Sequence, residues 1–350
     1  MAEQLFILFC SLGFIALFVW GFRYLPQERW QMMAVIPYRK KNSSHWHGAN
    51  LTFYGFLIAC AIAVGVLFSL ILLQSVSISL PGVFVVMLLI LAVCLPASRI
   101  MARLVEKKRY TFTIGGAFFC GLLLTPWGIV AVNAFLRSSG SQELDMMALL
   151  AALAIGYTLG EGLGRLACVS FGCCYGKPLK DCCRMTNLLF SRLAFVFTGI
   201  TKKAVYEGAL EGEKLIPIQG LTCILYTATA LFSAHLFLTA HYVAAFLISL
   251  LVSQVWRIIS ETMRADFRGF SKVSAYQKMS LAALPYAFLI TVLAPTPMLP
   301  APSVIQGLSI FSQPLPMISV QFLWLALFWV FGRSMVTSST ISFQVVQEHI

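Results

Sequence analysis

Two groups of arginine and glutamate residues in this chain have the types and spacing needed to bind an anionic headgroup. Glu161 and Arg165 are four residues apart, so in a helix their side chains lie on one face and can pair. Arg257, Glu261 and Arg264 follow one another at i, i+4 and i+7, which again places them on one helical face. Guanidinium groups present forked donors that match phosphate oxygens. If the two faces meet at one depth, they predict a site that binds a phosphate and stabilises its departure.

These charged residues belong to a chain that is otherwise strongly apolar. Of its 350 residues, 59% are hydrophobic and 11% charged, and the mean hydropathy is +0.85. Soluble domains carry about 25% charged residues. Inserting an ionisable residue into a membrane span costs roughly 2.5–3.5 kcal/mol of free energy. The presence of Arg165 and Arg257 in such spans therefore favours a functional role over simple ion pairing at the span ends. The same composition excludes a nucleic-acid partner despite the net charge of +12.

The chain contains nine apolar runs that approach the length of a membrane-spanning helix, about twenty residues. They predict an all-α, polytopic membrane helical bundle of about nine transmembrane helices without a separate soluble domain. The polar segment 172–215 is expected to form a small cap loop on this bundle. The nine runs are Leu5–Phe22, Leu51–Leu73, Leu80–Ala97, Phe112–Leu136, Met146–Phe171, Ile216–Leu238, Tyr242–Ile259, Met279–Ala294 and Met317–Phe331.

Basic residues alternate from loop to loop and predict an orientation. Of the 25 Lys and Arg residues, all but Arg137 and Arg333 fall in or beside the first, third, fifth and seventh loops. The positive-inside rule places those loops in the cytoplasm, with the N-terminus outside and the C-terminus cytoplasmic. The motif that contains Arg165 therefore faces the cytoplasm in this interpretation.

The motif GEGLGRLACVSFGCCYGKP, which spans Gly160 to Pro178, resembles the prolipoprotein diacylglyceryl transferases, in particular divergent members with a GCCYG core. The resemblance extends from about Leu51 to Leu293 and implies a seven-helix transferase-like core with one extra span at each end. We therefore divide the chain into residues 1–50, a core of residues 51–295, and residues 296–350. By resemblance, the catalytic candidates are Arg165, Arg257, Tyr54, Glu261 and Cys173. The substrate-binding candidates are Arg264, Arg99, Gly115, Gly116, Gly164, Gly172, Gly176 and Gln277.

The chain departs from the family motif at chemically important positions. The histidine that the resemblance implies as proton acceptor falls on Ile114, and the signature glutamate falls on Cys173. His45 and His47 precede the second span and could replace the proton acceptor, but histidines beside a tryptophan more often lie at the headgroup level. Tyr54 could hold a phosphate oxygen, or could be an interfacial tyrosine.

The clustered cysteines allow three interpretations. Cys173 or Cys174 could act as a nucleophile or carrier, because both stand beside a glycine turn and basic residues. Cys168 is more simply a small buried apolar side chain. A metal site is not expected, because Cys168, Cys173, Cys174, Cys182 and Cys183 contain no C-x2-C pair.

The resemblance implies an enzyme that moves a diacylglyceryl group from phosphatidylglycerol, or another anionic phospholipid, to the cysteine thiol of a lipoprotein precursor. It needs no cofactor, and it is expected in the inner (cytoplasmic) membrane of a bacterial cell. Two alternatives stay open: a transferase with a different acceptor on the cytoplasmic leaflet, and a lipid transporter or scramblase. The second is less favoured because the sequence shows no inverted repeat.

Overall fold

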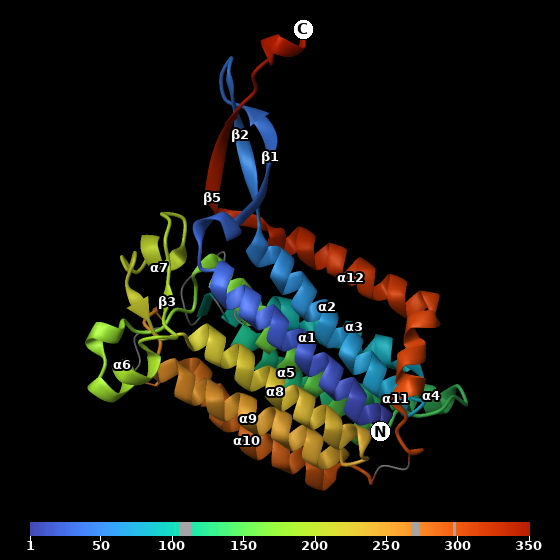
Figure 1. Cartoon of the computed structure of the whole chain (residues 1–350). Coiled ribbons are helices and arrows are strands. Elements are labelled where there is room, and N and C mark those ends of the chain that lie inside the picture. Colours follow the sequence, from blue (N-terminus) through green and yellow to red (C-terminus); the bar gives the residue numbers. More distant parts are fainter. Residues whose placement is uncertain (102, 105–113, 268–272, 297–298) are drawn as a thin grey trace.

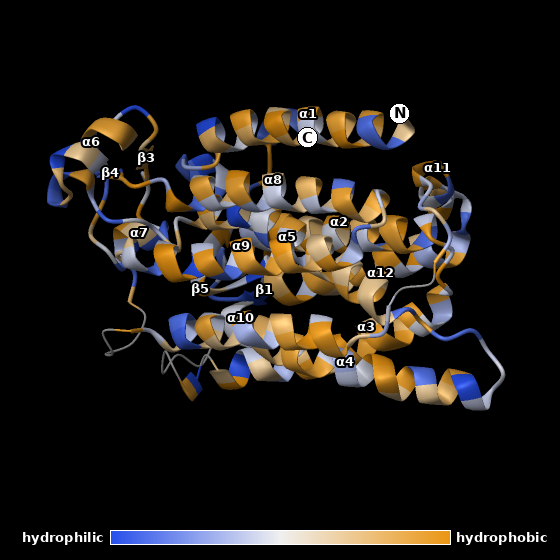
Figure 2. Ribbon diagram, turned by 90° about the horizontal axis from the view of Figure 1, so that it is seen from below, coloured by the Kyte–Doolittle hydropathy of each residue, from blue (hydrophilic) through white to orange (hydrophobic). Residues whose placement is uncertain are grey.

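The long apolar runs form long helices that lie roughly side by side in one bundle. In the computed structural model, which describes residues 1–101, 103–104, 114–267, 273–296 and 299–350, the helix axes share one direction (Figure 1). Apolar residues dominate the long helices, and hydrophilic residues lie mainly at helix ends and in loops (Figure 2). The long helices are α1 (Ala2–Tyr24), α2 (Phe53–Ser75), α3 (Leu80–Met101), α4 (Ile114–Ser138), α5 (Met146–Phe171), α8 (Ile218–Leu238), α9 (Tyr242–Thr262), α10 (Ala275–Leu293) and α12 (Pro314–Gly332).

Eight of these helices, found among the described residues, are long and apolar enough to cross a membrane. The exception is α10, which corresponds to the predicted run Met279–Ala294 and packs against α9 and α4. The predicted membrane-spanning helical bundle is thus confirmed, with α10 as the one span that length and composition do not support. Residues 112–113, at the start of another predicted run, lie outside the described residues.

A three-stranded antiparallel sheet projects from one end of the bundle (Figure 1). Its strands are β1 (Met32–Lys40), β2 (His45–Thr52) and β5 (Arg333–Ser342), with β2 in the centre. The sequence analysis did not predict this sheet, because the strands lie in a basic loop and a terminal tail. Pairing of His45 with Ser342, among others, joins the two segments that we treated as separate additions.

The β2–β5 pairing bears on how many helices cross the membrane. Strand β2 precedes α2 and strand β5 follows α12, so the chain between them returns to the same end of the bundle. A return requires an even number of crossings, and the eight apolar helices of the described residues, without α1, leave seven. The nine-span prediction counts α10 as the eighth crossing, and this part of the prediction stays a prediction.

The central element of the bundle is α5, which contacts α2, α8 and α9. Its first turn is capped by Asp145, whose carboxylate accepts from the Ala148 N–H at 2.8 Å. Helices α2 and α5 cross closely at glycines: a Cβ on Gly156 would lie 2.4 Å from the carbonyl oxygen of Gly65. The side chains of α5 are therefore held from several directions.

A small cap follows α5 at the same end of the bundle as the sheet (Figure 1). Helix α5 ends at Gly172, whose φ of 69° is the left-handed conformation that glycine adopts easily. The cap contains α6 (Arg184–Phe190), α7 (Lys203–Tyr206), β3 (Phe195–Val196) and β4 (Lys214–Leu215), and the last two pair. The remaining short elements are α11 (Val304–Leu308) and the 3-10 turns Glu28–Trp30, Leu179–Asp181, Ser309–Ser312 and Gln347–His349.

Lys202 joins this cap to the bundle. Its side chain is fully buried, and Nζ donates to the carbonyl oxygens of Ser170 at 2.5 Å and Leu25 at 3.1 Å. Those carbonyls lie at the C-terminal ends of α5 and α1, where a donor satisfies groups that have no partner within the helix.

The burial of Lys202 predicts a pH-dependent stability. Burial lowers the pKa of Lys202 to about 7, whereas an unfolded lysine titrates near pH ~10.4. Between these values the unfolded chain binds the extra proton, so the free energy of unfolding should rise as the pH increases from about 7 to about 10. Thermal unfolding should show a higher Tm at the upper end of that range. Lys202→Met should remove most of this pH-dependent difference in Tm. Lys180→Met, which replaces a lysine in an exposed ion pair with Glu213, should leave the difference in Tm intact.

Candidate functional site

Helix α5 places four chemically active side chains on one face. Tyr157, Glu161, Arg165 and Cys168 are separated by four, four and three residues, so they succeed one another along a single stripe. The stripe ends where the cap begins. The site is built around this stripe.

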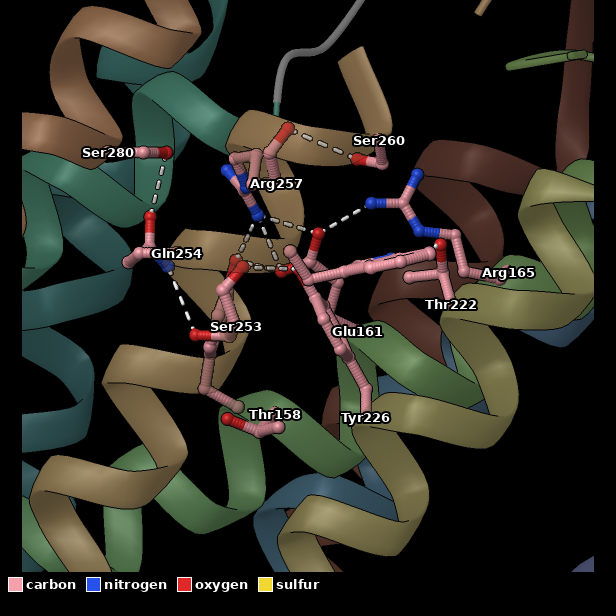
Figure 3. Close-up of polar contacts among 12 residues, drawn as sticks. Thr158, Glu161, Arg165, Thr222, Tyr226, Ser253, Gln254, Arg257, Ser260 and Ser280 are labelled. Atoms are coloured by element: carbon pink, nitrogen blue, oxygen red, sulfur yellow. Dashed lines mark hydrogen bonds and ion pairs between the residues drawn. The ribbon is translucent and has the colours of Figure 1, made fainter. Parts of the chain in front are cut away.

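Glu161 lies at the centre of a buried polar cluster that joins α5 to α9 (Figure 3). Its carboxylate accepts from Arg165 Nη2 at 2.6 Å and from Arg257 Nη2 at 2.6 Å. The Tyr157 hydroxyl donates to the same carboxylate and accepts from Arg257 at 2.9 Å. The exposed fractions of the three charged side chains are 1% for Glu161, 8% for Arg257 and 15% for Arg165. The two arginines that we expected to converge therefore meet on one carboxylate.

The cluster keeps one positive charge in excess and two unused donors. Two guanidinium groups share a single carboxylate, and the Nε atoms of Arg165 and Arg257 are buried without a hydrogen-bond partner among the described residues. A buried donor without a partner costs about 1–3 kcal/mol, so each such group calls for an acceptor. An anion placed between the two arginines would supply both the charge and the acceptors.

Arg264 forms a second charged group beside the first. It donates from Nε and Nη2 to the two carboxylate oxygens of Asp266, both at 2.7 Å, and lies 3.4 Å from Glu261 Oε1. Its backbone pairs with Gly176 of the cap as an isolated antiparallel bridge. A Cβ on Gly176 would lie 2.4 Å from the carbonyl oxygen of Ile216, so only glycine permits this close approach. The cap thus fixes the position of Arg264.

Both groups open onto one cavity of about 100 Å³ at the cap end of the bundle. Its wall combines arginines and carboxylates with hydroxyls, an amide and two thiols. Gln219 donates from Nε2 to the carbonyl oxygen of Cys173 at 2.9 Å, while its Oε1 is buried without a partner among the described residues. The lining residues are Tyr54, Gly115, Glu161, Arg165, Cys168, Cys174, Ile218, Gln219, Thr222, Tyr226, Arg257, Ser260, Glu261, Arg264 and Tyr276.

The structure gathers some of the predicted site residues at the cavity wall and leaves others outside it. Tyr54 lies against Phe171 with ring centroids 5.5 Å apart. Gln277 lies away from the described wall and caps α10, where its N–H donates to Ser274 Oγ at 3.1 Å and its Nε2 donates to the Ile258 carbonyl oxygen. The predicted residues at the wall are Tyr54, Gly115, Arg165, Arg257, Glu261 and Arg264.

Five further predicted residues lie in nearby elements but not at the described wall. Gly164 packs on α2, where a Cβ would meet Ile58 at an ordinary 3.6 Å. Gly172 ends α5 and Gly176 admits the bridge to Arg264. Gly116 lies in α4 and Arg99 in the last turn of α3. Of the family histidine position, Ile114, the structure describes the backbone only.

Several wall or cluster residues did not enter the sequence-based site, namely Tyr157, Ile218, Gln219, Thr222, Tyr226, Ser260 and Tyr276. Tyr157 had a detectable signal, because it stands four residues before Glu161. Tyr226 donates to the Ser253 carbonyl oxygen at 2.7 Å and so joins α8 to α9. Its sequence surroundings contain no comparable spacing signal.

Three cysteines converge where α5 ends. The Sγ atoms of Cys168, Cys173 and Cys174 all lie within 4.8 Å of one another. The spacing test for metal sites did not detect this group because the chain reverses at Gly172, which returns Cys173 and Cys174 to the last turn of the helix. Hydrogen bonds with the thiols of Cys168 and Cys174, and then burial, raise the pKa of Cys173 well above its usual range, which disfavours Cys173 as an isolated thiolate nucleophile.

Gly115 allows Arg257 to reach its partners. A Cβ on Gly115 would lie 2.9 Å from Arg257 Nη1 and 3.0 Å from the ring of Tyr276. Gly115→Ala should therefore displace Arg257 and lower the free energy of unfolding by about 1–3 kcal/mol, as overpacking does. Gly128→Ala, in the same helix with no described atom within 4 Å, is the matched control and should leave stability unchanged or raised. Thermal unfolding in detergent measures both, and equal Tm values for the two variants would contradict the prediction.

The fold and the cavity together define a multi-pass membrane protein with a cavity lined by arginines and glutamates at one end of its helices. The family model of the prolipoprotein diacylglyceryl transferases matches residues 44–293. The chain belongs to this family and is an enzyme of the diacylglyceryl transferase class, as the motif resemblance implied. No curated protein matches the chain significantly.

Proposed function

We propose that the chain transfers a diacylglyceryl group from phosphatidylglycerol to a thiol, by family membership the cysteine thiol of a lipoprotein precursor. The single observation that carries the proposal is the pair Arg165 and Arg257 beside the cavity: they share the one carboxylate of Glu161, and their buried Nε donors have no hydrogen-bond partner among the described residues. A phosphodiester is a monoanion with several acceptor oxygens, so it matches both properties.

The reaction divides into binding and departure of the phosphate. Arg165 and Arg257 bind the phosphodiester, Tyr54 helps to orient it from the adjoining wall, and Glu261 helps indirectly by its pairing with Arg264. The acceptor sulfur attacks the glycerol carbon attached to the phosphate. A C–S bond forms, the C–O bond breaks, and its electron pair leaves with glycerol phosphate. Guanidinium donors then stabilise the charge that develops on the departing oxygen.

Chemistry also argues against a covalent enzyme intermediate on Cys173. Attack by Cys173 on the same carbon would give a thioether, and a thioether does not release its carbon to a second thiol. Direct transfer to the acceptor is therefore the mechanism we propose, and the family position held by Cys173 needs another explanation.

Transfer and lipid transport are distinguished by the products. Purified protein is incubated with phosphatidylglycerol labelled in its headgroup and with a peptide that contains one cysteine. Transfer predicts labelled glycerol phosphate and a peptide heavier by one diacylglyceryl group. Movement of intact labelled lipid between leaflets without either product would overturn the proposal in favour of a scramblase. Headgroup release with an unmodified peptide would indicate a different acceptor.

The charge distribution favours an active site that faces the cytoplasm of a bacterial inner membrane. Basic residues concentrate at the end of the bundle that carries the sheet, the cap and the cavity. We expect a C-terminal reporter that is active only in the cytoplasm to give signal, and one that is active only outside to give none. The reverse pattern would place the site on the outer leaflet surface, where exported lipoprotein precursors are accessible.

A further inference from the structure

The three cysteines beside the cavity have the geometry of a metal site. Cys168 lies in the last turn of α5, and the Cys173 N–H donates to its carbonyl oxygen at 3.1 Å after the turn at Gly172. Cys174 follows with φ of 57°. None of the ten cysteines of the chain, each within the described ranges, forms a disulfide. No other group of metal-ligating side chains this compact occurs in the described part of the chain.

The sulfur separations suit a thiophilic d10 cation. A Zn–S distance of ~2.3 Å in tetrahedral geometry separates two sulfurs by about 3.8 Å. Three Sγ atoms within 4.8 Å of one another reach that arrangement with small side-chain rotations. Thiolate ligands select zinc or copper(I) over the hard cations.

The surrounding charges are those that a thiolate cluster requires. Arg165 lies within electrostatic range of Cys168 and Cys174, and Arg264 within range of Cys174. Lys203 of the cap faces Cys173 and Cys174. Three thiolates with Zn²⁺ carry one net negative charge, which these cations offset within a low-dielectric surrounding.

A zinc ion held by three protein ligands keeps a fourth position open. Cys168 and Cys174 both line the cavity that contains Arg165 and Arg257, so the open position is directed toward the phosphate-binding arginines. Structural zinc sites are closed by four protein ligands, whereas catalytic sites use three. A thiol that binds zinc loses its proton.

We propose that Cys168, Cys173 and Cys174 bind a zinc ion whose fourth position takes the acceptor thiol and converts it to the nucleophilic thiolate. This inference rests on the proposed transfer and removes the need for the proton acceptor that Ile114 cannot provide, because a zinc-bound thiol gives up its proton to solvent. The acceptor S–H proton passes to solvent on binding. The zinc-bound sulfur attacks the glycerol carbon, the C–O bond breaks toward phosphate, and the thioether product is a weak ligand that dissociates.

The metal is tested separately from activity. Protein purified with zinc is dialysed and analysed for metal, and we expect about one zinc per chain. Cys168→Ser, Cys173→Ser and Cys174→Ser should each weaken zinc binding by roughly 100-fold or more, beyond the 10–100-fold typical of lost outer-shell partners. Cys182→Ser and Cys183→Ser, in the same cap but outside the cluster, should retain zinc. Variants are compared as monodisperse protein, and a Tm lowered to the value of the metal-free wild-type protein is the expected consequence of losing zinc.

A cobalt-loaded protein reports the open position directly. Co²⁺ in a three-thiolate site gives sulfur-to-metal charge-transfer absorption, and the cysteine peptide should change that spectrum, whereas a serine peptide should not. No metal in the wild-type protein, or metal retained in all three serine variants, would overturn the zinc site. An unchanged cobalt spectrum with the cysteine peptide would overturn its role toward the acceptor.

Failure of this inference and failure of the proposed function give different results. Transfer that continues at the full rate after zinc is removed by a chelator would overturn the inference and leave the transferase intact. Zinc bound through the three cysteines, without any product from phosphatidylglycerol, would support the metal site and overturn the proposed function.

Discussion

Replacing Arg257 with lysine should lower kcat/KM for headgroup release by roughly 10²–10³, the cost of losing one donor at a developing oxyanion. Lysine keeps the charge but lacks the planar guanidinium, whose Nη2 donates to both Glu161 oxygens and to the Tyr157 hydroxyl and whose Nε is buried without a hydrogen-bond partner among the described residues. Radiolabelled glycerol phosphate released from phosphatidylglycerol measures the effect.

The control is Arg137→Lys. Arg137 also binds a carboxylate, that of Glu143 at 2.8 and 2.9 Å, but its side chain is 73% exposed and belongs to the opposite end of the bundle. Its replacement should leave the rate within error. A wild-type rate for Arg257→Lys would remove Arg257 from the reaction.

The second large effect is expected on stability. Glu161→Gln leaves two buried guanidinium groups without their shared carboxylate, and breaking such a buried pair costs about 3–5 kcal/mol. The exposed ion pair between Arg137 and Glu143 provides the comparison. Glu143→Gln should lower the free energy of unfolding by only about 0–1 kcal/mol. Thermal or denaturant unfolding in detergent distinguishes the two variants.

An anion should partly rescue Glu161→Gln. The substitution leaves Arg165 and Arg257 with two positive charges at the cavity, so phosphatidylglycerol should raise the Tm of this variant more than that of the wild-type protein. Uncharged lipid of equal chain length should give no differential rescue. Equal stabilisation of both proteins by phosphatidylglycerol would mean that the arginines do not hold the headgroup.

The parts of the site that follow helical periodicity were predictable from the sequence. The Glu161–Arg165 pair requires only an i, i+4 spacing on a helix, and the apolar runs located the helix. The pairing of Glu161 with Arg257 was not predictable in this way, because the residues are 96 positions apart and meet only through packing of α5 on α9. The expectation that Arg257 faces the same phosphate came from the family motif.

Turns and strands limited the prediction elsewhere. Gly172 reverses the chain, and the side chains on either side of it become neighbours although their spacing matches no metal motif. The strands β2 and β5 were not predicted because they lie far apart in the chain and neither has an alternating apolar pattern; β5 in addition is rich in Ser and Thr.

The sheet makes the two terminal additions interdependent. Thr52 at the end of β2 donates to the carbonyl oxygen of Gly332 at 3.1 Å, and β5 continues from that point along the whole of β2. A fragment trimmed to the family-matched residues 44–293 would lack both neighbours of β2 and expose two rows of unpaired backbone groups, a template for self-association. The two terminal segments therefore protect each other's strand edges through β2, and shortening either one should increase the tendency of the protein to aggregate.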